Sequence, residues 1–301
     1  MKLLVLGGNG QLGFELLRAL APLGEVMAST RSGRLADGAP CETADLDRPE
    51  SLAALVERIA PDVVVNAAAW TAVDRAEAEP EAAARANAQA PAVLARACRA
   101  HDALLVHYST DYVFPGDAAR PYREDDATGP LGVYGAGKLA GEQAIRASGA
   151  RHLILRTAWV YAARGNNFLR TMLRLGGERE VLQVVADQIG TPTPAWLIAD
   201  ASAQAIARAP DASGTWHLTA AGRTSWHGFA ERIFDQAVAR GLLAHAPRVE
   251  AIGSDQYPTP ARRPAWSVLD NRRFQRDFGL VLPAWEDALA PVLDRIALPP
   301  R

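Results

Sequence analysis

The sequence predicts an α/β protein built on a doubly wound parallel sheet, followed by a smaller lobe. Apolar strands and amphipathic helices alternate from residue 2 to residue 156, which is the pattern of repeated βαβ units. The first strand runs directly into a glycine-rich turn, and the pattern loosens after residue 156. We therefore expect a dinucleotide-binding domain over residues 1–158. Residues 159–301 should form mainly a substrate-binding lobe, with segments near 181–219 returning to the first domain.

The glycine turn lies between a buried-type strand, Lys2–Leu6, and an amphipathic stretch, Phe14–Leu20. Missing side chains in such a turn let the backbone approach a pyrophosphate, whose charge the helix N-terminus stabilises. A tight turn alone would explain a lone glycine motif, but the strand-to-helix context favours a Rossmann-type dinucleotide site. The glycines with the required spacing are Gly7, Gly10 and Gly13.

The second strand, Glu25–Ala28, lacks the carboxylate that an NAD-preferring site usually offers to the ribose 2′-hydroxyl. Thr30 and Arg31 follow it instead and would suit a 2′-phosphate, so we expect NADPH to be preferred and NADH to be usable. A solvated arginine is the alternative. Asp45, before the helix predicted over Pro49–Ile59, could accept from an adenine amino group or cap that helix, and the two roles are equally supported.

Two further strands, Asp62–Val65 and Ala103–Tyr108, should end at the same edge of the sheet as the glycine turn. Mostly small residues follow the first of them, at 66–70, and would let a cofactor pass over the strand end. Thr110 and Asp111 follow the second strand and would lie beside the glycine turn. On its own, such a pair would be only a turn.

Tyr134 and Lys138 are four residues apart, so on a helix both side chains would point into one cleft. A cation beside a phenol stabilises phenolate. We therefore expect the pKa of Tyr134 to fall below its usual value of about 10, toward the range for proton exchange at neutral pH. An exposed i, i+4 pair is the alternative. Only Lys2 and Lys138 are lysines among 32 Lys+Arg, which favours a chemical requirement for a compact ammonium at position 138.

Composition argues against several classes of protein. With 34 acidic and 32 basic residues among 301, the net charge of −2 gives no strong field toward nucleic acid or an anionic membrane. We find no long apolar run or signal-peptide pattern, and Cys41 and Cys98 lack metal-ligand or redox spacing, so we expect a cytoplasmic protein. The six histidines lack metal-site spacing and are expected to be ordinary polar or packing residues.

Beyond residue 156 the sequence predicts mostly helices, with one strand over Thr215–Leu218. Arginine and tryptophan cluster in Arg262–Trp266, which would suit a lobe that clamps a base and a diphosphate, although core packing explains the aromatics equally well. Earlier in the chain, the helical region after residue 70 is expected to break near Pro91. The helices predicted after residue 156 are Asn167–Leu175, Trp196–Arg208, Trp226–Arg240 and Trp285–Ile296.

Several motifs together resemble the extended short-chain dehydrogenases/reductases and, within them, the dTDP-4-dehydrorhamnose reductase family. The resemblance covers essentially the whole chain. It implies reduction of the 4-keto group of dTDP-6-deoxy-L-lyxo-4-hexulose to give dTDP-L-rhamnose, with a reduced nicotinamide cofactor. The motifs that carry the resemblance are NAAAWTAVDRAE (66–77), HYSTDYVF (107–114), residues 133–142, RTAWVYAARGNNF (156–168), DQIGTPT (187–193) and residues 257–264.

The resemblance also implies roles for individual residues. Tyr134 would be the general acid, Lys138 would lower its pKa and bind the nicotinamide ribose, and Thr110 would hydrogen-bond the carbonyl oxygen. Asp111 and Trp159 match positions that contact the substrate. Positions that contact the cofactor are matched by Gly10, Gln11, Leu12, Asp45, Leu46, Ala68, Ala69 and Trp70, although Tyr or His is expected in place of Trp70.

Some members of the family are thought to dimerise through Mg²⁺ held by clustered carboxylates, and two of the matching positions here are Glu15 and Asp200. The third carboxylate is replaced by Trp196, whose indole N–H cannot ligate a cation. We therefore expect no bound metal, Mg²⁺-independent catalysis, and solvated Glu15 and Asp200 side chains. The protein should be a monomer, or a weak homodimer with apolar contacts that include Trp196.

Two alternatives remain open at this point. One is another sugar-nucleotide reductase or epimerase of the superfamily, and the other is a non-catalytic, dinucleotide-binding regulatory subunit. Loss of Tyr134 or Lys138 would favour the regulatory subunit, and both are present. The residues therefore predict an enzyme with no nucleic-acid or membrane partner, and the resemblance implies a dTDP-sugar substrate.

Overall fold

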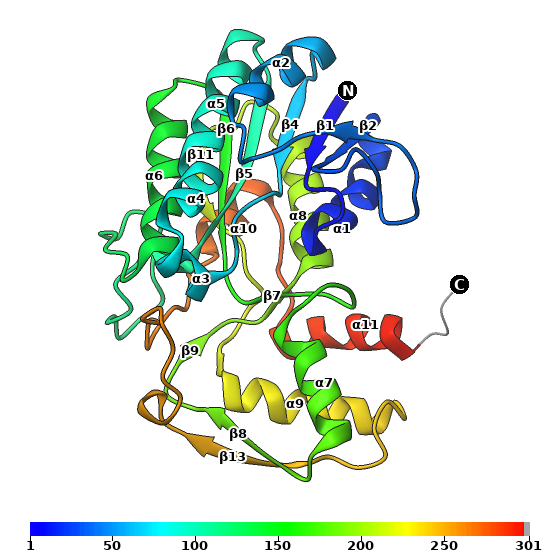
Figure 1. Ribbon diagram of the computed structural model, residues 1–301, viewed down its shortest axis with the longest axis vertical. Coiled ribbons are helices and arrows are strands. Elements are labelled where there is room, and N and C mark those ends of the chain that lie inside the picture. Colours follow the sequence, from blue (N-terminus) through cyan, green and yellow to red (C-terminus); the bar gives the residue numbers. More distant parts are fainter. Residues whose placement is uncertain (298–301) are drawn as a thin grey trace.

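A seven-stranded parallel sheet forms the larger lobe in the computed structural model, which describes residues 1–297 (Figure 1). Every neighbouring pair of strands in it is parallel, and the chain winds outward in both directions from its centre, which confirms the predicted doubly wound α/β fold. In spatial order the strands are β11 (Gly214–His217), β6 (His152–Thr157), β5 (Leu104–Thr110), β4 (Val63–Asn66), β1 (Lys2–Leu6), β2 (Glu25–Thr30) and β3 (Glu42–Thr43).

Helices cover both faces of this sheet, and the smaller lobe lies beyond the carboxyl ends of its strands (Figure 1). The winding direction reverses between β1 and β4, and ligands of such sheets bind at this kind of reversal. The helices of the larger lobe are α1 (Gln11–Leu20), α2 (Glu50–Ile59), α3 (Val73–Ala78), α4 (Pro80–Ala84), α5 (Ala90–Ala100), α6 (Val133–Ala147), α8 (Ala195–Arg208) and α10 (Arg272–Phe278).

Both faces of the central strands are buried, which explains their continuous apolar sequence. In β1, Leu3 and Val5 belong to a core with α1 and α8, and Leu4 and Leu6 belong to a second core with α2 and α5. Alternate residues of a strand point to opposite faces, so one apolar run contributes to both cores. The apolar face of α1 is thereby fixed on the sheet, and its N-terminus lies at the carboxyl edge.

The helical region after β4 does not break near Pro91, so that prediction was wrong. Helix α4 continues through a π-helical segment, Arg85–Gln89, into α5. Pro91 lies in the first turn of α5, directly after the π-helical segment, where the regular i→i−4 hydrogen bonds that a proline would interrupt are already replaced by i→i−5 bonds. The π-helical segment also brings Asn87 against the loop after β4, where its side-chain amide bonds both the N–H and the carbonyl oxygen of Trp70 at 3.0 Å.

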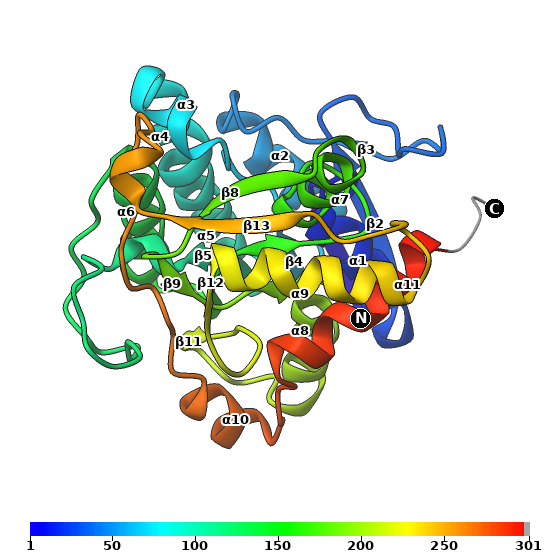
Figure 2. The same cartoon turned by 90° about the horizontal axis from the view of Figure 1, so that it is seen from below.

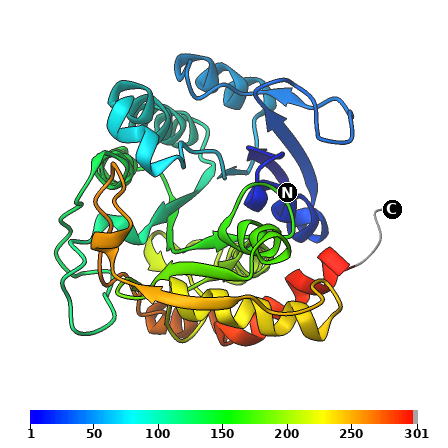
Figure 3. The ribbon, with the colours of Figure 1, turned by 60° about the horizontal axis from the view of Figure 1, so that its bottom comes forward.

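The smaller lobe combines helices with a two-stranded parallel ribbon, β8 (Val181–Val185) and β13 (Arg248–Ile252). Helix α9 (Trp226–Ala239) packs against both strands, and Figures 2 and 3 show β13 lying alongside it. This ribbon and α10 were not predicted, because each is short and half-exposed. The remaining elements are β7 (Val160–Tyr161), α7 (Phe168–Glu178), β9 (Ile189–Gly190), β10 (Thr193–Pro194), β12 (Thr224–Ser225) and α11 (Trp285–Ala297).

Residues 181–219 contribute to both lobes. Strand β8 pairs with β13 in the smaller lobe, whereas α8 packs against α1 and β11 pairs with β6 at the edge of the large sheet. The chain therefore crosses between the lobes more than once. Over residues 1–297, no helix is both long enough and apolar enough to span a membrane.

A buried ion pair fixes α6 to the sheet. The Arg156 guanidinium of β6 donates to both carboxylate oxygens of Glu142, at 2.9 and 2.7 Å. The two side chains are only 3% and 0% exposed. Burial alone would raise the pKa of Glu142, but the hydrogen bonds and charge of Arg156 lower it. Glu142 therefore anchors the helix one turn after Lys138.

Glu142→Gln should lower the free energy of unfolding by about 3 kcal/mol, because it leaves the Arg156 charge buried and unpaired. Urea denaturation monitored by circular dichroism measures this. The matched control is Glu178→Gln on α7, where both partners of the Arg174–Glu178 pair are more than half exposed, and the expected change is below about 0.5 kcal/mol. Equal effects of the two substitutions would contradict a structural role for the buried pair.

Candidate active site

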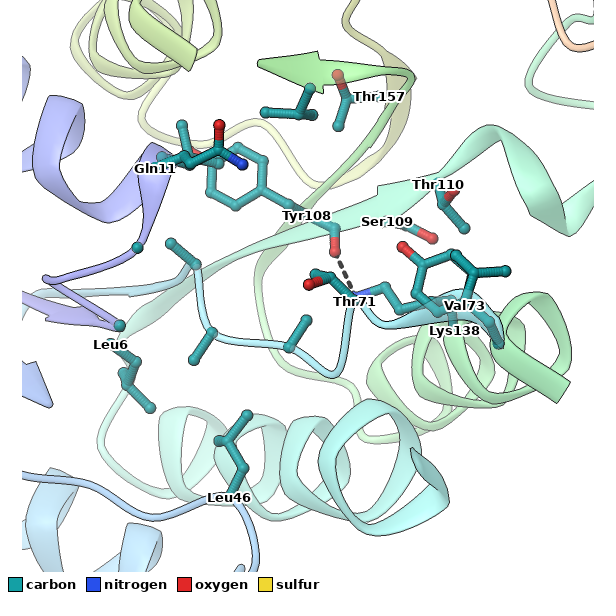
Figure 4. Close-up of a pocket in the computed structure, with 18 of the residues that line it drawn as sticks. Leu6, Gln11, Leu46, Thr71, Val73, Tyr108, Ser109, Thr110, Lys138 and Thr157 are labelled. Atoms are coloured by element: carbon teal, nitrogen blue, oxygen red, sulfur yellow. Dashed lines mark hydrogen bonds between the residues drawn. The ribbon is translucent and has the colours of Figure 1, made fainter. Parts of the chain in front are cut away.

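A cavity of about 860 Å³ opens at the carboxyl edge of the sheet, with walls from both lobes. It joins the glycine turn to the ends of β4, β5 and β6 and to the first turns of α6; Figure 4 shows Gln11, Thr110 and Lys138 around it. A cavity of this size suits a small-molecule ligand. The predicted site residues that line it are Gly7, Gly10, Gln11, Leu12, Thr30, Arg31, Leu46, Ala68, Ala69, Thr110, Asp111, Tyr134, Lys138 and Trp159.

Three predicted cofactor residues, Gly13, Asp45 and Trp70, do not line the cavity. Gly13 instead allows helix and strand to pack closely, because a β-carbon there would overlap the carbonyl oxygen of Gly7. Asp45 faces Arg31, with 3.5 Å between its Oδ1 and the guanidinium Nε. The Trp70 indole donates to a carbonyl oxygen of its own loop. These three residues therefore support the walls of the site without lining the cavity.

The glycine turn has the geometry that a pyrophosphate requires. Gly7 has a φ of +84°, and a β-carbon there would lie 3.1 Å from Ala68. Helix α1 has no acidic residue in its first turn and no side-chain cap. The first amides of a helix have no partner within it, so the N–H groups of Gln11 and Leu12 offer donors and a positive helix end to an anionic diphosphate.

At the end of the cavity next to β2, Arg31 stands beside two carboxylates. Its side chain is 75% exposed, and its guanidinium lies 3.5 Å from Asp45 and 3.6 Å from Asp47. Thr30 Oγ1 donates to the carbonyl oxygen of Arg34 at 3.0 Å and accepts from its N–H at 3.1 Å. Arg31 fits a 2′-phosphate through its charge, while the two carboxylates weaken the attraction.

The N-terminus of α6 is fixed by a residue of α3. Glu77 Oε1 accepts a hydrogen bond from the Val133 N–H at 2.9 Å, which satisfies one of the free amides of the first turn. Its negative charge is also favourable at the positive end of the helix. Tyr134 and Lys138 then follow one turn apart, and both line the cavity. The predicted helical arrangement of the pair is therefore present.

The pKa of Tyr134 is higher than the sequence predicted. Burial raises it to about 12, and the charge of Asp111 adds to the increase, while a hydrogen bond with Thr110 opposes it. Among the described residues, the Lys138 amine makes no hydrogen bond to the phenol: it donates to the Tyr108 carbonyl oxygen at 2.6 Å and lies 3.2 Å from His107 Nε2. The expected lowering of the pKa by Lys138 was therefore wrong for this arrangement. A phenol with this pKa holds its proton at neutral pH, which suits a proton donor.

Burial acts in the opposite direction on Lys138. It lowers the pKa of the amine to about 8, although the negative charge of Glu142 favours the ammonium. Figure 4 shows the lysine side chain reaching the Tyr108 carbonyl oxygen at the cavity wall. Two buried groups of one helical turn thus have pKa values shifted in opposite directions, which is frequent at catalytic sites.

Thr110 and Asp111 form a hydrogen-bonded pair under Tyr134. Thr110 Oγ1 donates to Asp111 Oδ1 at 2.9 Å and accepts from the Tyr112 N–H at 3.2 Å. Asp111 Oδ2 is buried and has no hydrogen-bond partner among the described residues. Burial raises the pKa of Asp111 to about 6, although the nearby Ser267 and Thr110 hydroxyls favour the charged form. This carboxyl group therefore titrates much closer to neutral pH than an exposed aspartate.

Several residues of the site were not predicted from the sequence. Trp226, at the start of α9, stacks on Trp159 with ring centroids 3.5 Å apart, and both line the cavity. Arg263 also lines it and pairs with Asp74 at 2.7 Å. The Arg262–Trp266 cluster was a signal for Arg263, but no local pattern distinguishes Trp226. His107, expected to be an ordinary packing residue, contacts Lys138.

Glu15 and Asp200 are paired with arginines. Arg295 donates to Glu15 Oε1 at 2.6 Å, and Arg18 donates to Asp200 Oδ1 at 2.6 Å. Glu15 is buried, so the expectation that it is solvated was wrong. Within residues 1–297, no group of three or more His, Cys, Asp or Glu side chains is arranged to hold a metal ion. The residues present do not fit Mg²⁺, because the carboxylate charges are already neutralised by guanidinium groups.

Trp196 replaces the third carboxylate and has contacts within its own chain. Its indole N–H lies 3.3 Å from the carbonyl oxygen of Ala288, and its ring packs against the core beside α8. It therefore connects α8 to α11. This part of the chain is held together by ion pairs and an indole hydrogen bond, all of them intramolecular.

The fold and the site together define an extended short-chain dehydrogenase/reductase, with a glycine turn at the switch point of the sheet and a Tyr–Lys pair on the helix beside it. A family model described as RmlD substrate binding domain matches residues 1–298. The chain belongs to this family, which is that of the dTDP-4-dehydrorhamnose reductases.

Three relatives illustrate the similarity. A dTDP-4-dehydrorhamnose reductase from Burkholderia thailandensis is 51% identical over 300 residues, which are 96% of this chain and 97% of that protein. The crystal structure of one from Clostridium acetobutylicum has a TM-score of 0.90 at 35% identity, over 99% of this chain and 100% of that one. One from Bacillus anthracis, solved in complex with NADP, has a TM-score of 0.88 at 32% identity, over 98% and 99%.

Asp111→Asn should stabilise the protein at pH 8 and change little at pH 4. In the unfolded chain Asp111 ionises near pH 4, whereas in the folded protein it stays protonated up to about pH 6. Between these values the folded state binds more protons, so stability falls as the pH rises. Removing the charge should restore on the order of 2–3 kcal/mol at pH 8, measured by urea unfolding at both pH values.

Asp126→Asn is the control with the opposite sign. Arg120 lowers the pKa of Asp126 to about 2, so its charge stabilises the fold above the unfolded pKa, and this stabilisation is lost as the pH falls from about 4 toward 2. Its replacement should destabilise at pH 8. If Asp111→Asn, like Asp126→Asn, lowered the free energy of unfolding at pH 8, then the ionised Asp111 carboxylate would not destabilise the folded protein.

Proposed function

We propose that this protein is an NADPH-dependent dTDP-4-dehydrorhamnose reductase, which reduces the 4-keto group of dTDP-6-deoxy-L-lyxo-4-hexulose to give dTDP-L-rhamnose. The observation that carries the proposal is the placement of Tyr134 and Lys138 one helical turn apart in a cavity that begins at the glycine turn. The near full-length similarity to proteins of that name, at 51% identity in one case, supports the substrate class.

When bound, NADPH supplies a hydride to the carbonyl carbon, and charge develops on the carbonyl oxygen. Tyr134 donates a proton to that oxygen, since its raised pKa keeps the phenol protonated at neutral pH. Thr110 would turn its hydroxyl proton, which it donates to Asp111 in this structure, toward the same oxygen. Asp111 orients the Thr110 hydroxyl, and with Trp159 it contacts the sugar.

The cofactor is held along the carboxyl edge of the sheet. The turn from Gly7 to Leu12 would bind the pyrophosphate through backbone N–H groups and the helix end. Thr30 and Arg31 would hold the adenosine ribose and its 2′-phosphate, and Lys138 would hold the nicotinamide ribose. The complex of the Bacillus anthracis relative with NADP supports the choice of NADPH, and NADH is usable. Gly13, Asp45, Leu46, Ala68, Ala69 and Trp70 form or support the remaining walls.

One lobe binds mainly the cofactor and the other binds mainly the substrate. Residues 1–158, with α8 and β11, form the cofactor-binding unit, and the rest of residues 159–301 forms the substrate-binding unit as far as the chain is described. Trp159, Trp226 and Arg263 bring substrate-facing groups from the second unit into the cavity. The protein acts as a monomer or as a weak homodimer, because the carboxylates at the Mg²⁺ positions are paired within one chain. The two cysteines, which lack redox spacing, support a cytoplasmic location.

A spectrophotometric assay of NADPH oxidation with enzymatically generated dTDP-6-deoxy-L-lyxo-4-hexulose tests the proposal. The expected result is stoichiometric formation of dTDP-L-rhamnose, identified by chromatography against an authentic standard. Binding of NADPH without any turnover would identify a non-catalytic dinucleotide-binding subunit. Interconversion of epimers without net cofactor oxidation would identify an epimerase.

Tyr134→Phe should reduce kcat by about 10² to 10⁴-fold, because the proton donor is lost while the ring and its packing remain. The affinity for NADPH, measured by fluorescence titration, should be nearly unchanged. The control is Tyr161→Phe, since the buried Tyr161 hydroxyl has no hydrogen-bond partner among the described residues and its loss should leave kcat within about twofold. More than a tenth of wild-type kcat in Tyr134→Phe would remove Tyr134 from the acid role.

Arg31→Ala should raise KM for NADPH more than KM for NADH, because only NADPH carries the 2′-phosphate that the guanidinium faces. Steady-state kinetics with both cofactors measures the two changes. We expect a modest difference, about three- to tenfold, because Asp45 and Asp47 already lie near the guanidinium. Equal increases in KM for both cofactors would show that Arg31 does not contact the 2′-phosphate.

Removal of divalent cations should leave the activity unchanged, because Glu15 and Asp200 are held by Arg295 and Arg18. The measurement is kcat/KM after dialysis against EDTA, with and without added Mg²⁺. Loss of activity with EDTA and its recovery with Mg²⁺ would contradict this expectation.

A further inference from the structure

A chain of buried hydrogen bonds runs from the loop after β4 to Lys138. Asn66 and His107 are register neighbours on β4 and β5, and each is 1% exposed. The Ala68 N–H donates to Asn66 Oδ1 at 3.3 Å, and Asn66 Nδ2 lies 3.1 Å from His107 Nδ1. His107 Nε2 lies 3.2 Å from Lys138 Nζ, which donates to the Tyr108 carbonyl oxygen at 2.6 Å.

The direction of the chain follows from its first bond. Because Asn66 Oδ1 accepts from a backbone N–H, the amide presents its NH₂ group to His107. Nδ1 of the ring must then accept, so a neutral His107 carries its proton on Nε2. Burial lowers the pKa of His107 well below its usual value, which favours the neutral ring whatever the charge of Lys138. The Nε2–H group therefore points at Lys138.

Only one protonation state of Lys138 satisfies every bond in this chain. An amine has a lone pair that can accept from Nε2–H, whereas an ammonium has three donors and no acceptor. With Lys138 charged, two N–H groups would face each other at 3.2 Å in a buried place, where an unsatisfied donor is costly. With Lys138 neutral, each donor from Ala68 to the lysine has an acceptor.

We propose that His107, oriented by Asn66, is a positioning residue that stabilises the neutral amine of Lys138, so that this lysine releases and regains a proton in each turnover. The proposal rests on the proposed function, which places Lys138 behind the proton donor Tyr134. Tyr134 loses its proton to the alkoxide. The Lys138 ammonium then gives up one proton, which a water molecule passes to the phenolate because the two side chains are not hydrogen-bonded to each other, and a solvent proton restores the ammonium. The last two steps are proton transfers and involve no oxidation or reduction.

The other groups around this chain of hydrogen bonds either favour or oppose the positive charge of Lys138. His107 faces Asn66 from β4, Lys138 from α6 and the apolar Ile154, its register neighbour on β6. Glu142, one turn after Lys138, favours the ammonium. Its carboxylate is shared by Arg156 and Arg146, which limits that effect. Within this chain of hydrogen bonds, the imidazole N–H of His107 is thus the group that directly contacts Lys138 and opposes its positive charge.

The small number of lysines allows a direct test. The chain contains only Lys2 and Lys138, so protein labelled with ¹³C and ¹⁵N in lysine gives two side-chain Nζ–Cε signals, and Lys2→Arg assigns them. We would titrate the ¹³Cε shift of both lysines in the full-length protein. Lys2, whose amine donates to a carbonyl oxygen, serves as the internal reference. The expected result is that Lys138 titrates at least one pH unit below Lys2.

Two substitutions test the role of the chain. His107→Gln places an amide that can turn its oxygen toward the ammonium. Asn66→Asp places a carboxylate that moves the imidazole proton to Nδ1 and makes Nε2 an acceptor. Both should move the Lys138 titration upward by about one pH unit or more, and the basic limb of kcat should move by the same amount. His152→Gln on β6, whose ring contacts the Ala150 carbonyl oxygen, is the matched control and should move neither.

The outcomes separate this inference from the proposed function. A Lys138 titration that coincides with that of Lys2, or that moves downward in His107→Gln, would mean that His107 accepts from an ammonium and would overturn the inference. An unchanged Lys138 titration in both substitutions would also overturn it. The titration needs no substrate, so it stands even if the reductase assay fails. If one variant does not fold, the other decides the question.

Discussion

The close packing of α6 against the end of β5 and the π-helical segment is the constraint on which the site depends. Two glycines of α6 make it feasible: a β-carbon on Gly135 would overlap the Tyr112 carbonyl oxygen, and one on Gly141 would overlap that of Asn87. Without these side chains the helix approaches closely enough for the Lys138 amine to reach the end of β5. The sheet edge and the helix are therefore closely packed, and a shift of α6 would move both Tyr134 and Lys138.

Burial sets the chemistry of this unit. It raises the pKa of Tyr134 and of Asp111 and lowers that of Lys138, because in each case the charged form loses hydration. The groups differ in their hydrogen bonds. Lys138 contacts a carbonyl oxygen and an imidazole, whereas the phenol has Thr110 as its nearby hydroxyl. A protonated phenol and a lysine that titrates near pH 8 are the combination that a proton-donating site needs.

The smaller lobe adds groups that close the cavity. Trp159 has a left-handed backbone with φ +47°, a costly conformation for a bulky residue, and its ring fills the space above Gly190. It stacks on Trp226 from α9, so the strained segment after β6 is held by the second lobe. The Arg263–Asp74 pair joins the C-terminal segment to α3 on the opposite wall. The site is thus assembled from both lobes, and its substrate-facing side depends on their docking.

The sequence by itself determined the sheet, the glycine turn and the Tyr134–Lys138 pair, because these are local patterns: apolar runs, glycine spacing and a four-residue separation on a helix. Only the tertiary structure decided which neighbours those residues meet. Pro91 stays within a continuous helical run, since a π-helical segment accommodates it. Glu15 is buried against Arg295, which lies 280 residues away along the chain. The pKa of Tyr134 rises because the phenol is buried, while the Lys138 amine bonds the Tyr108 carbonyl oxygen. His107 contacts Lys138 because strand register and helix packing bring them together. Long-range contacts and desolvation leave no signature in a short stretch of sequence, and those two effects set the chemistry of this site.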